Sequence, residues 1–111
     1  MKKIEAIIKP FKLANVKAAR RNSGWKAWRL RTSRASDARR DPEIYRGSEY
    51  AVDFRPKIKV EIVVVQAQGT AAVAAIVTAA KTGKIGAGKV IASAIENAIR
   101  IRTEETGERA V

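Results

Sequence analysis

The sequence predicts an α+β fold of the ferredoxin-like type, with its elements in the order βαββαβ. Three observations predict it. Lys2 to Ile8 alternates apolar and charged residues with the period of a half-buried strand. Lys57 to Val65 is rich in β-branched residues, as strands are. Gly69 to Ala80 is rich in alanine, with larger apolar residues at helical spacing, and therefore predicts a helix.

The first half of the chain supplies a strand, a helix and a second strand. Pro10 ends the first strand. Leu13 to Asn22 is a predicted helix that ends before Gly24, a residue typical of helix C-termini. Two polar residues in its last turn, Arg20 and Ser23, interrupt the apolar stripe of the helix. Trp25 to Ser33 alternates again and predicts the second strand.

A long loop is expected from Arg34 to Tyr50, because this segment has little apolar periodicity and contains proline and glycine. Loops of this length inside a compact domain are usually functional or disordered. After the second helix, Lys89 to Ser93 predicts the fourth strand and Ala94 to Ile101 a short helix. The charged tail from Thr103 is expected to lie on the surface.

The two helices are expected to cover one face of the sheet and to leave the other face bare. A bare apolar face needs a partner, and three copies that pack their sheets inward would provide one. The sequence therefore predicts that each chain forms one domain spanning residues 1–111 and that three chains associate as a trimer.

Thr82 to Lys89 contains three glycines and two lysines in eight residues, Thr-Gly-Lys-Ile-Gly-Ala-Gly-Lys. Glycines let main-chain N–H groups converge on an anion, and a lysine adds positive charge. Gly83 to Lys89 matches part of a P-loop, but Val90 replaces the serine or threonine that binds Mg²⁺. This loop also leads from a helix into a strand, which is the reverse of a P-loop. It therefore predicts a different kind of phosphate site.

Composition excludes several classes of function. The 111 residues contain no cysteine and no histidine, which removes disulfides, imidazole bases and the usual zinc ligands. Acidic side chains number 11 against 23 lysines and arginines, so we expect neither an enzyme nor a resident metal site. The N-terminus lacks the apolar stretch of a signal peptide and no run reaches about 18 apolar residues, so a cytoplasmic protein without membrane insertion is expected.

The net charge of +12 leaves a nucleic-acid or other anionic partner open, although less favoured. Two tryptophans, Trp25 and Trp28, lie among basic residues and could stack on bases. The plainer alternative places these tryptophans on a strand or at a subunit interface, with the arginines in solvent. The basic residues concerned are Arg20, Arg21, Lys26, Arg29, Arg31, Arg34, Arg39 and Arg40.

Several segments, in the right order, resemble the PII signal-transduction proteins, trimeric regulators that report nitrogen, energy and carbon status. Lys2 to Leu13 is similar to the opening strand of that family, and Tyr45 to Tyr50 to its loop signature. The glycine loop approaches the second signature, and Arg100 to Thr103 matches the arginine pair beyond it. These segments, with those around Asp53 and Lys57, cover roughly two thirds of the chain.

The resemblance implies that ATP or ADP, possibly with Mg²⁺, binds in clefts between subunits. The glycine loop would surround the phosphates, the two arginines would neutralise them, and two β-strand residues would lie near the ribose and adenine. The residues at these positions are Gly86, Gly88, Lys89, Arg100, Arg102, Glu61 and Val63. The resemblance also implies that the long loop docks into partner proteins of nitrogen metabolism, with Tyr50 and Ser48 at positions that are modified in some members.

The chain also departs from the family pattern. Ala87 replaces an aspartate between the last two glycines, and nothing between Leu30 and Asp41 matches the Gly-Phe-Gly-Arg-Gln-like segment whose glutamine helps to hold Mg²⁺ and 2-oxoglutarate. We therefore do not expect 2-oxoglutarate sensing. Polar residues on the first helix and the lack of aromatic residues in the last strand leave an alternative open: an engineered or repurposed PII scaffold that serves as a structural subunit of a larger assembly.

Overall fold

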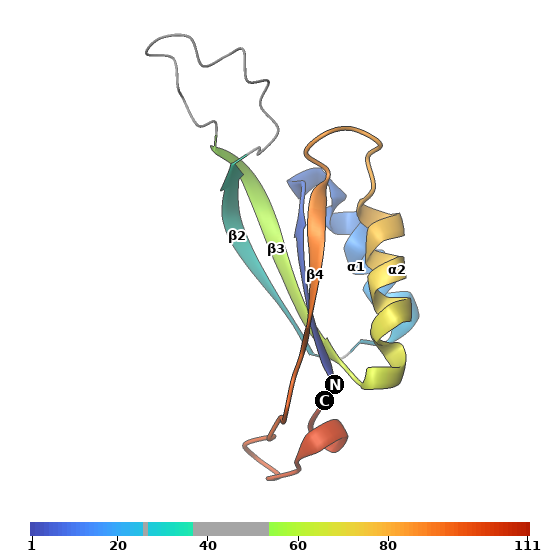
Figure 1. Cartoon of the computed structure of the whole chain (residues 1–111), viewed down its shortest axis with the longest axis vertical. Helices are drawn as coiled ribbons and strands as arrows, with labels where there is room; N and C mark the ends of the chain where they lie inside the picture. The colour runs from blue at the N-terminus through green and yellow to red at the C-terminus, as the bar shows by residue number, and fades with distance from the viewer. Residues whose placement is uncertain (26, 37–53) are drawn as a thin grey trace.

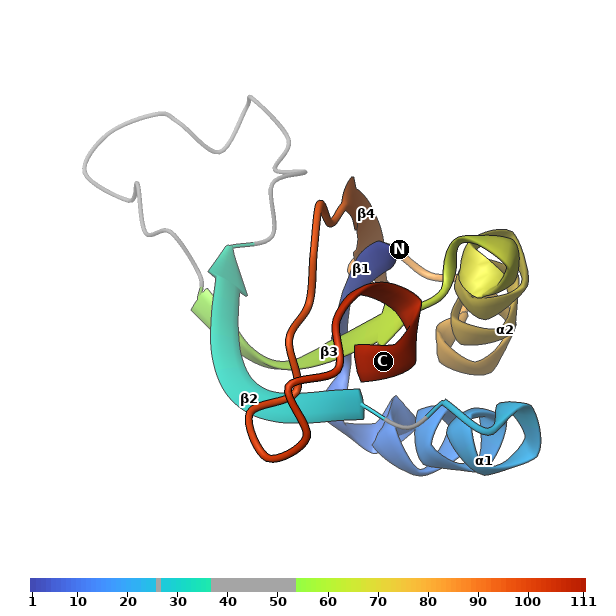
Figure 2. The same ribbon diagram turned by 90° about the horizontal axis from the view of Figure 1, so that it is seen from below.

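The protein is a four-stranded antiparallel sheet with two helices on one face (Figures 1 and 2). The computed structural model describes residues 1–25, 27–36 and 54–111. The order of the strands across the sheet is β2-β3-β1-β4, as the ferredoxin-like fold requires. The elements are β1 (Lys2–Ile8), α1 (Leu13–Ser23), β2 (Ala27–Ser36), β3 (Phe54–Val64), α2 (Gly69–Ala80) and β4 (Gly88–Ala94), with 3-10 turns at Pro10–Lys12, Gln66–Gln68 and Gly107–Ala110.

The hydrophobic core lies between the sheet and the helices. Alternate residues of β1 and β3 point into it, because side chains of a strand alternate between the two faces. The fully buried members from the strands are Ile4, Ala6, Ile8, Val60, Ile62 and Val64. From α2, Ala72 and Ile76 are inaccessible to solvent. In β1, buried and partly exposed residues alternate, which confirms the half-buried strand that the sequence predicts.

Trp25 belongs to this core, with only 6% of its surface exposed. It follows the end of α1, where Gly24 adopts a φ of 71° and donates its N–H to the Arg20 carbonyl. The Arg20 side chain in turn donates from Nε to the Trp25 carbonyl at 3.1 Å. Arg20 therefore interrupts the apolar stripe because it holds the chain as it turns toward β2. A buried Trp25 is not available to stack on nucleic-acid bases, which weakens the nucleic-acid hypothesis.

The second and third strands are longer than their apolar alternation predicts. β2 begins at Ala27 rather than Trp25 and continues to Ser36, and β3 begins at Phe54 rather than Lys57. The two strands pair without interruption from Ala27 opposite Val63 to Ser36 opposite Phe54. Hydrogen bonding between neighbours extends the ladder beyond the part that contacts the core. The remainder of the predicted long loop lies outside the described residues.

The short helix predicted from Ala94 to Ile101 is wrong: β4 ends at Ala94, and bends and turns follow. The backbone N–H groups here have other acceptors. The Ile95 N–H donates to the Met1 carbonyl at 3.1 Å, and Asn97 Oδ1 accepts from the N–H groups of Ala98 and Gly107. Such side-chain acceptors compete with helical hydrogen bonds. An isolated bridge between Ile99 and Thr106 then closes the segment.

Candidate functional site

The glycine loop links the end of α2 to the start of β4, as the sequence predicts. Gly83, Gly86 and Gly88 have φ values of 74°, 85° and 115°, in the region that residues with a side chain rarely adopt. Thr82 also stabilises the turn, because its Oγ1 accepts a hydrogen bond from the Lys84 N–H at 3.2 Å. The loop therefore has left-handed backbone at three positions, a feature that anion-binding loops use.

Gly88 has a second reason to be glycine. A Cβ at this position would lie 1.7 Å from the Ile7 carbonyl oxygen. Gly88 pairs with Ile8 and Lys89 with Ile7, so the start of β4 is tightly apposed to the end of β1. The Lys89 side chain is exposed. The structure thus places Gly86, Gly88 and Lys89 close together at one end of the sheet, with the lysine open to solvent.

A residue that the sequence does not single out for this site, Lys57, reaches the glycine loop from β3. Its ammonium group donates a hydrogen bond to the Gly86 carbonyl. Only 8% of Lys57 is exposed. Nothing in the spacing of the sequence links positions 57 and 86. Its burial, which only the structure shows, is what distinguishes Lys57 from the other lysine of β3.

Glu61 and Val63 lie on the face of β3 that the helices leave bare. In the register of the sheet, Glu61 pairs with Glu5 on one side and with Arg29 on the other. Val63 pairs with Lys3 and is half-buried. Both predicted residues therefore belong to one surface, together with charged residues of β1 and β2.

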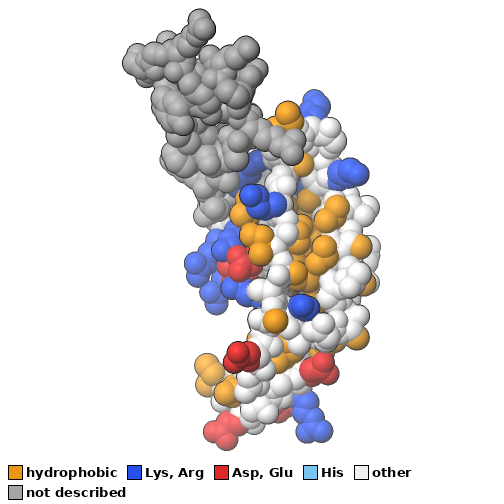
Figure 3. Space-filling model, viewed as in Figure 1, with side chains coloured by type: hydrophobic (Ala, Val, Ile, Leu, Met, Phe, Trp, Pro, Cys, Tyr) orange, Lys and Arg blue, Asp and Glu red, His pale blue; other side chains and the backbone are white. Residues whose placement is uncertain are grey.

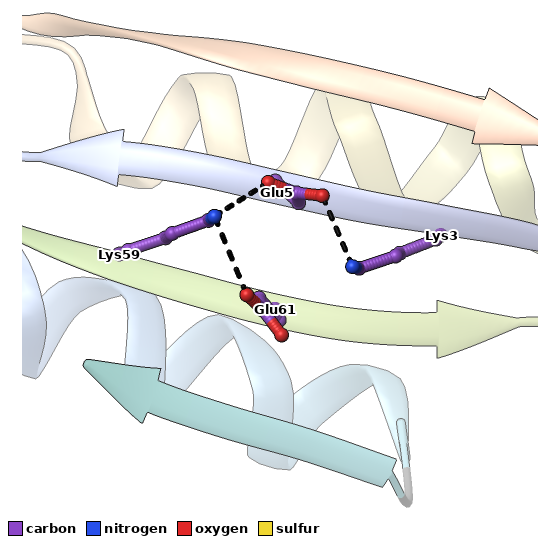
Figure 4. Close-up of polar contacts among 4 residues, drawn as sticks. All are labelled: Lys3, Glu5, Lys59 and Glu61. Atoms are coloured by element: carbon purple, nitrogen blue, oxygen red, sulfur yellow. Dashed lines mark ion pairs between the residues drawn. The ribbon is translucent and has the colours of Figure 1, made fainter.

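Four charged side chains form an ion-pair cluster on this face (Figure 4). Lys59 Nζ lies 2.9 Å from Glu5 Oε2 and 3.4 Å from Glu61 Oε1, and Lys3 Nζ lies 3.1 Å from Glu5 Oε1. The expectation of an apolar bare face is therefore wrong at its centre. Alternating acidic and basic residues on adjacent strands replace the expected apolar surface.

The cluster shifts the ionisation of its members. The hydrogen bond with Lys59, supported by Lys3, holds the pKa of Glu5 below its ordinary value. The same bond with Glu5 is the main cause that raises the pKa of Lys59. Both groups are therefore favoured in their charged forms, and Glu61 is held beside a fixed positive charge.

Arg100 and Arg102 lie beyond the opposite end of β4 from the glycine loop (Figure 1). Arg100 approaches Glu105, with Nη1 and Oε1 3.9 Å apart, and its N–H donates to the Glu105 carbonyl at 2.9 Å. Both arginine side chains are exposed. A strand of seven residues spans on the order of 20 Å. Within one chain, therefore, the arginine pair and the glycine loop do not meet.

The two predicted modification positions, Ser48 and Tyr50, lie outside the described residues. Among residues 1–25, 27–36 and 54–111, no three acidic side chains gather in a way that could hold a metal ion. In the same part of the chain, no helix combines the length and the apolar character needed to cross a bilayer.

A family model described as Nitrogen regulatory protein P-II matches residues 1–105. The chain is 51% identical over 112 residues to nitrogen regulatory protein P-II of Cereibacter sphaeroides and 48% identical to that of Rhizobium meliloti strain 1021, in both cases over the whole of each chain.

Solved structures agree with this assignment. A crystal structure of Arabidopsis thaliana PII bound to citrate is similar with a TM-score of 0.81 and 30% identity, over 99% of this chain and 91% of that one. The names of these relatives are those of regulatory proteins. The chain as a whole thus has full-length counterparts in sequence and in fold, and it belongs to the P-II nitrogen regulatory protein family.

Proposed function

We propose that the protein is a P-II-type regulator that binds ATP or ADP between copies of the chain and controls proteins of nitrogen metabolism. The observation that carries the proposal is the glycine loop, with left-handed backbone at Gly83, Gly86 and Gly88 directly before Lys89. Main-chain N–H groups in such a loop bind the oxygens of a polyphosphate, and a lysine supplies a compensating charge. Membership of the family supports the same ligand class.

The geometry favours a site that two copies of the chain share. Arg100 and Arg102 are suited to phosphate recognition, because guanidinium groups donate paired hydrogen bonds. Since a whole strand separates them from the glycine loop of the same chain, they can join such a loop only on a neighbouring copy. This requirement supports the trimer that the family resemblance implies.

Exposed apolar side chains also favour association. Figure 3 shows apolar side chains gathered along the visible face over β4 and α2. Val77 and Ile91 are 45% and 47% exposed. β4 is an edge strand, so its outer hydrogen-bonding groups have no partner within the sheet. An assembled protein would cover part of this surface.

We expect regulation to pass through the long loop between β2 and β3, as it does in the family that the chain resembles. We do not propose 2-oxoglutarate as an effector, because the sequence between Leu30 and Asp41 lacks the corresponding segment. ATP and ADP remain the proposed ligands, with Mg²⁺ entering only together with the nucleotide.

Isothermal titration calorimetry with ATP and ADP tests the proposal. The wild-type protein should bind both nucleotides, and Lys89→Ala and Arg102→Ala should each weaken binding by about tenfold or more, because each removes a charged contact to phosphate. Lys81→Ala is the matched control: it removes an exposed lysine at the end of α2 and should bind as the wild type does. Absence of binding by the wild-type protein would reject the proposed function.

A further inference from the structure

Lys57 is more than nine-tenths buried, which is rare for a lysine side chain. Removing an ammonium group from water is costly unless hydrogen-bond acceptors surround it. A lysine at this position on β3 therefore needs a structural or functional reason, and its hydrogen bond to the Gly86 carbonyl provides one.

The contact joins two parts of the fold that are not neighbours in the sheet. β1 lies between β3 and β4, so the axes of β3 and β4 are roughly 10 Å apart. The Lys57 side chain extends across this width to the last residues of the glycine loop. It is thus a cross-link from the middle of the sheet to a loop that is otherwise held at its ends by α2 and β4.

Peptide geometry gives this cross-link a specific consequence. The Gly86 carbonyl and the Ala87 N–H belong to one planar trans peptide and point in opposite directions. A hydrogen bond that fixes the carbonyl toward Lys57 therefore directs the Ala87 N–H away from it. Ala87 stands between Gly86 and Gly88, in the centre of the segment proposed to surround phosphate.

We propose that Lys57 is a positioning residue for nucleotide binding: it holds the Gly86–Ala87 peptide so that the Ala87 N–H donates to a phosphate oxygen. The inference rests on the proposed function and names a residue that acts on the ligand through the loop. Because the ammonium group is engaged by the protein, Lys57 contributes equally to the binding of a nucleoside diphosphate and of a triphosphate.

The competing role is direct contact between the ammonium group and the terminal phosphate. That role requires Lys57 to leave the Gly86 carbonyl, and it favours ATP over ADP because the triphosphate carries the additional charged group. The two roles therefore differ in nucleotide selectivity and in their effect on the loop before any ligand arrives.

The test compares Lys57→Met, Lys57→Arg and the exposed control Lys81→Met with the wild type. Methionine keeps most of the length of the buried side chain without its charge, and arginine keeps hydrogen-bond donors. Thermal unfolding first establishes that each variant is folded. The ¹⁵N heteronuclear NOE of the Ala87 amide is then measured without nucleotide, and ADP and ATP affinities are measured by calorimetry.

We expect Lys57→Met to lower the Ala87 heteronuclear NOE and to weaken ADP and ATP by the same factor, about tenfold. Lys57→Arg should recover most of both losses, and Lys81→Met should change neither. An unchanged NOE in Lys57→Met, or a loss for ATP that exceeds the loss for ADP by tenfold, would overturn the inference. If the wild-type protein bound neither nucleotide, the proposed function would fall, and the NOE comparison alone would decide whether Lys57 positions the loop.

Discussion

At the scale of single residues, the glycine loop depends on backbone conformations that only particular residues allow. Gly83 and Gly88 both have positive φ, yet their surroundings differ. A Cβ at Gly83 would meet nothing within 4 Å, whereas one at Gly88 would collide with the Ile7 carbonyl. A side chain at Gly83 would add only backbone strain, whereas a side chain at Gly88 would add backbone strain and a collision with β1.

Substitution of each glycine by alanine should measure these two costs. Gly83→Ala should lower the free energy of unfolding by about 1 kcal/mol, since it adds only the strain of positive φ. Gly88→Ala should cost about 3 kcal/mol or more, because the chain must also shift away from Ile7. Urea unfolding of both variants provides the comparison. Equal losses would show that the apposition of β4 to β1 is not a constraint.

At the scale of elements, the ion-pair cluster connects β1 and β3 on the bare face of the sheet. Glu5 lies between Lys3 and Lys59 and has its pKa lowered by them. A carboxylate whose pKa is lower in the folded state stabilises the protein above its unfolded pKa, and this contribution disappears as the pH falls through the folded pKa. The cluster is therefore expected to weaken as the pH falls below the ordinary pKa of a glutamate carboxyl.

Glu5→Gln tests this expectation, because glutamine keeps the shape of the side chain and cannot ionise. Between pH 6 and pH 3, the wild-type protein should lose more unfolding free energy than the variant, and 1 M salt should narrow the gap by screening these half-buried charges. Chemical denaturation at a series of pH values gives the two curves. Parallel curves over this range would contradict a stabilising role for Glu5.

Elements that local sequence patterns determine could be predicted, and elements that depend on distant contacts could not. β1 and α2 have the predicted bounds because alternation and helical spacing are local properties of the sequence. The ends of β2 and β3 depend on pairing with each other, and the segment after β4 depends on the Met1 carbonyl and on Asn97. Contacts of this kind connect distant positions and leave no periodic pattern.

The candidate site divides in the same way. The glycine loop could be predicted because its composition reflects its backbone conformation. The contribution of Lys57 could not, because its partner is 29 residues away. The charges of the bare face were present in the sequence, but the sequence did not show that Lys59 would lie between Glu5 and Glu61.

At the scale of the whole molecule, one chain carries the two parts of the proposed phosphate site at opposite ends of β4. Lys89 stands at the beginning of the strand, and Arg102 lies beyond its end. In a ring of identical subunits, each interface would bring the loop of one copy to the arginines of the next. The central claim is that nucleotide binds only where two copies meet.

Mixed trimers test this claim most directly. Lys89→Ala and Arg102→Ala chains are refolded together in equal amounts, and ATP binding is measured by calorimetry against each variant alone. In every mixed trimer, one of the three interfaces joins an intact Lys89 to an intact Arg102. With random mixing, about a quarter of the wild-type number of sites should therefore bind ATP with wild-type affinity. A mixture that binds no better than its parents would show that the site is not shared between neighbouring chains.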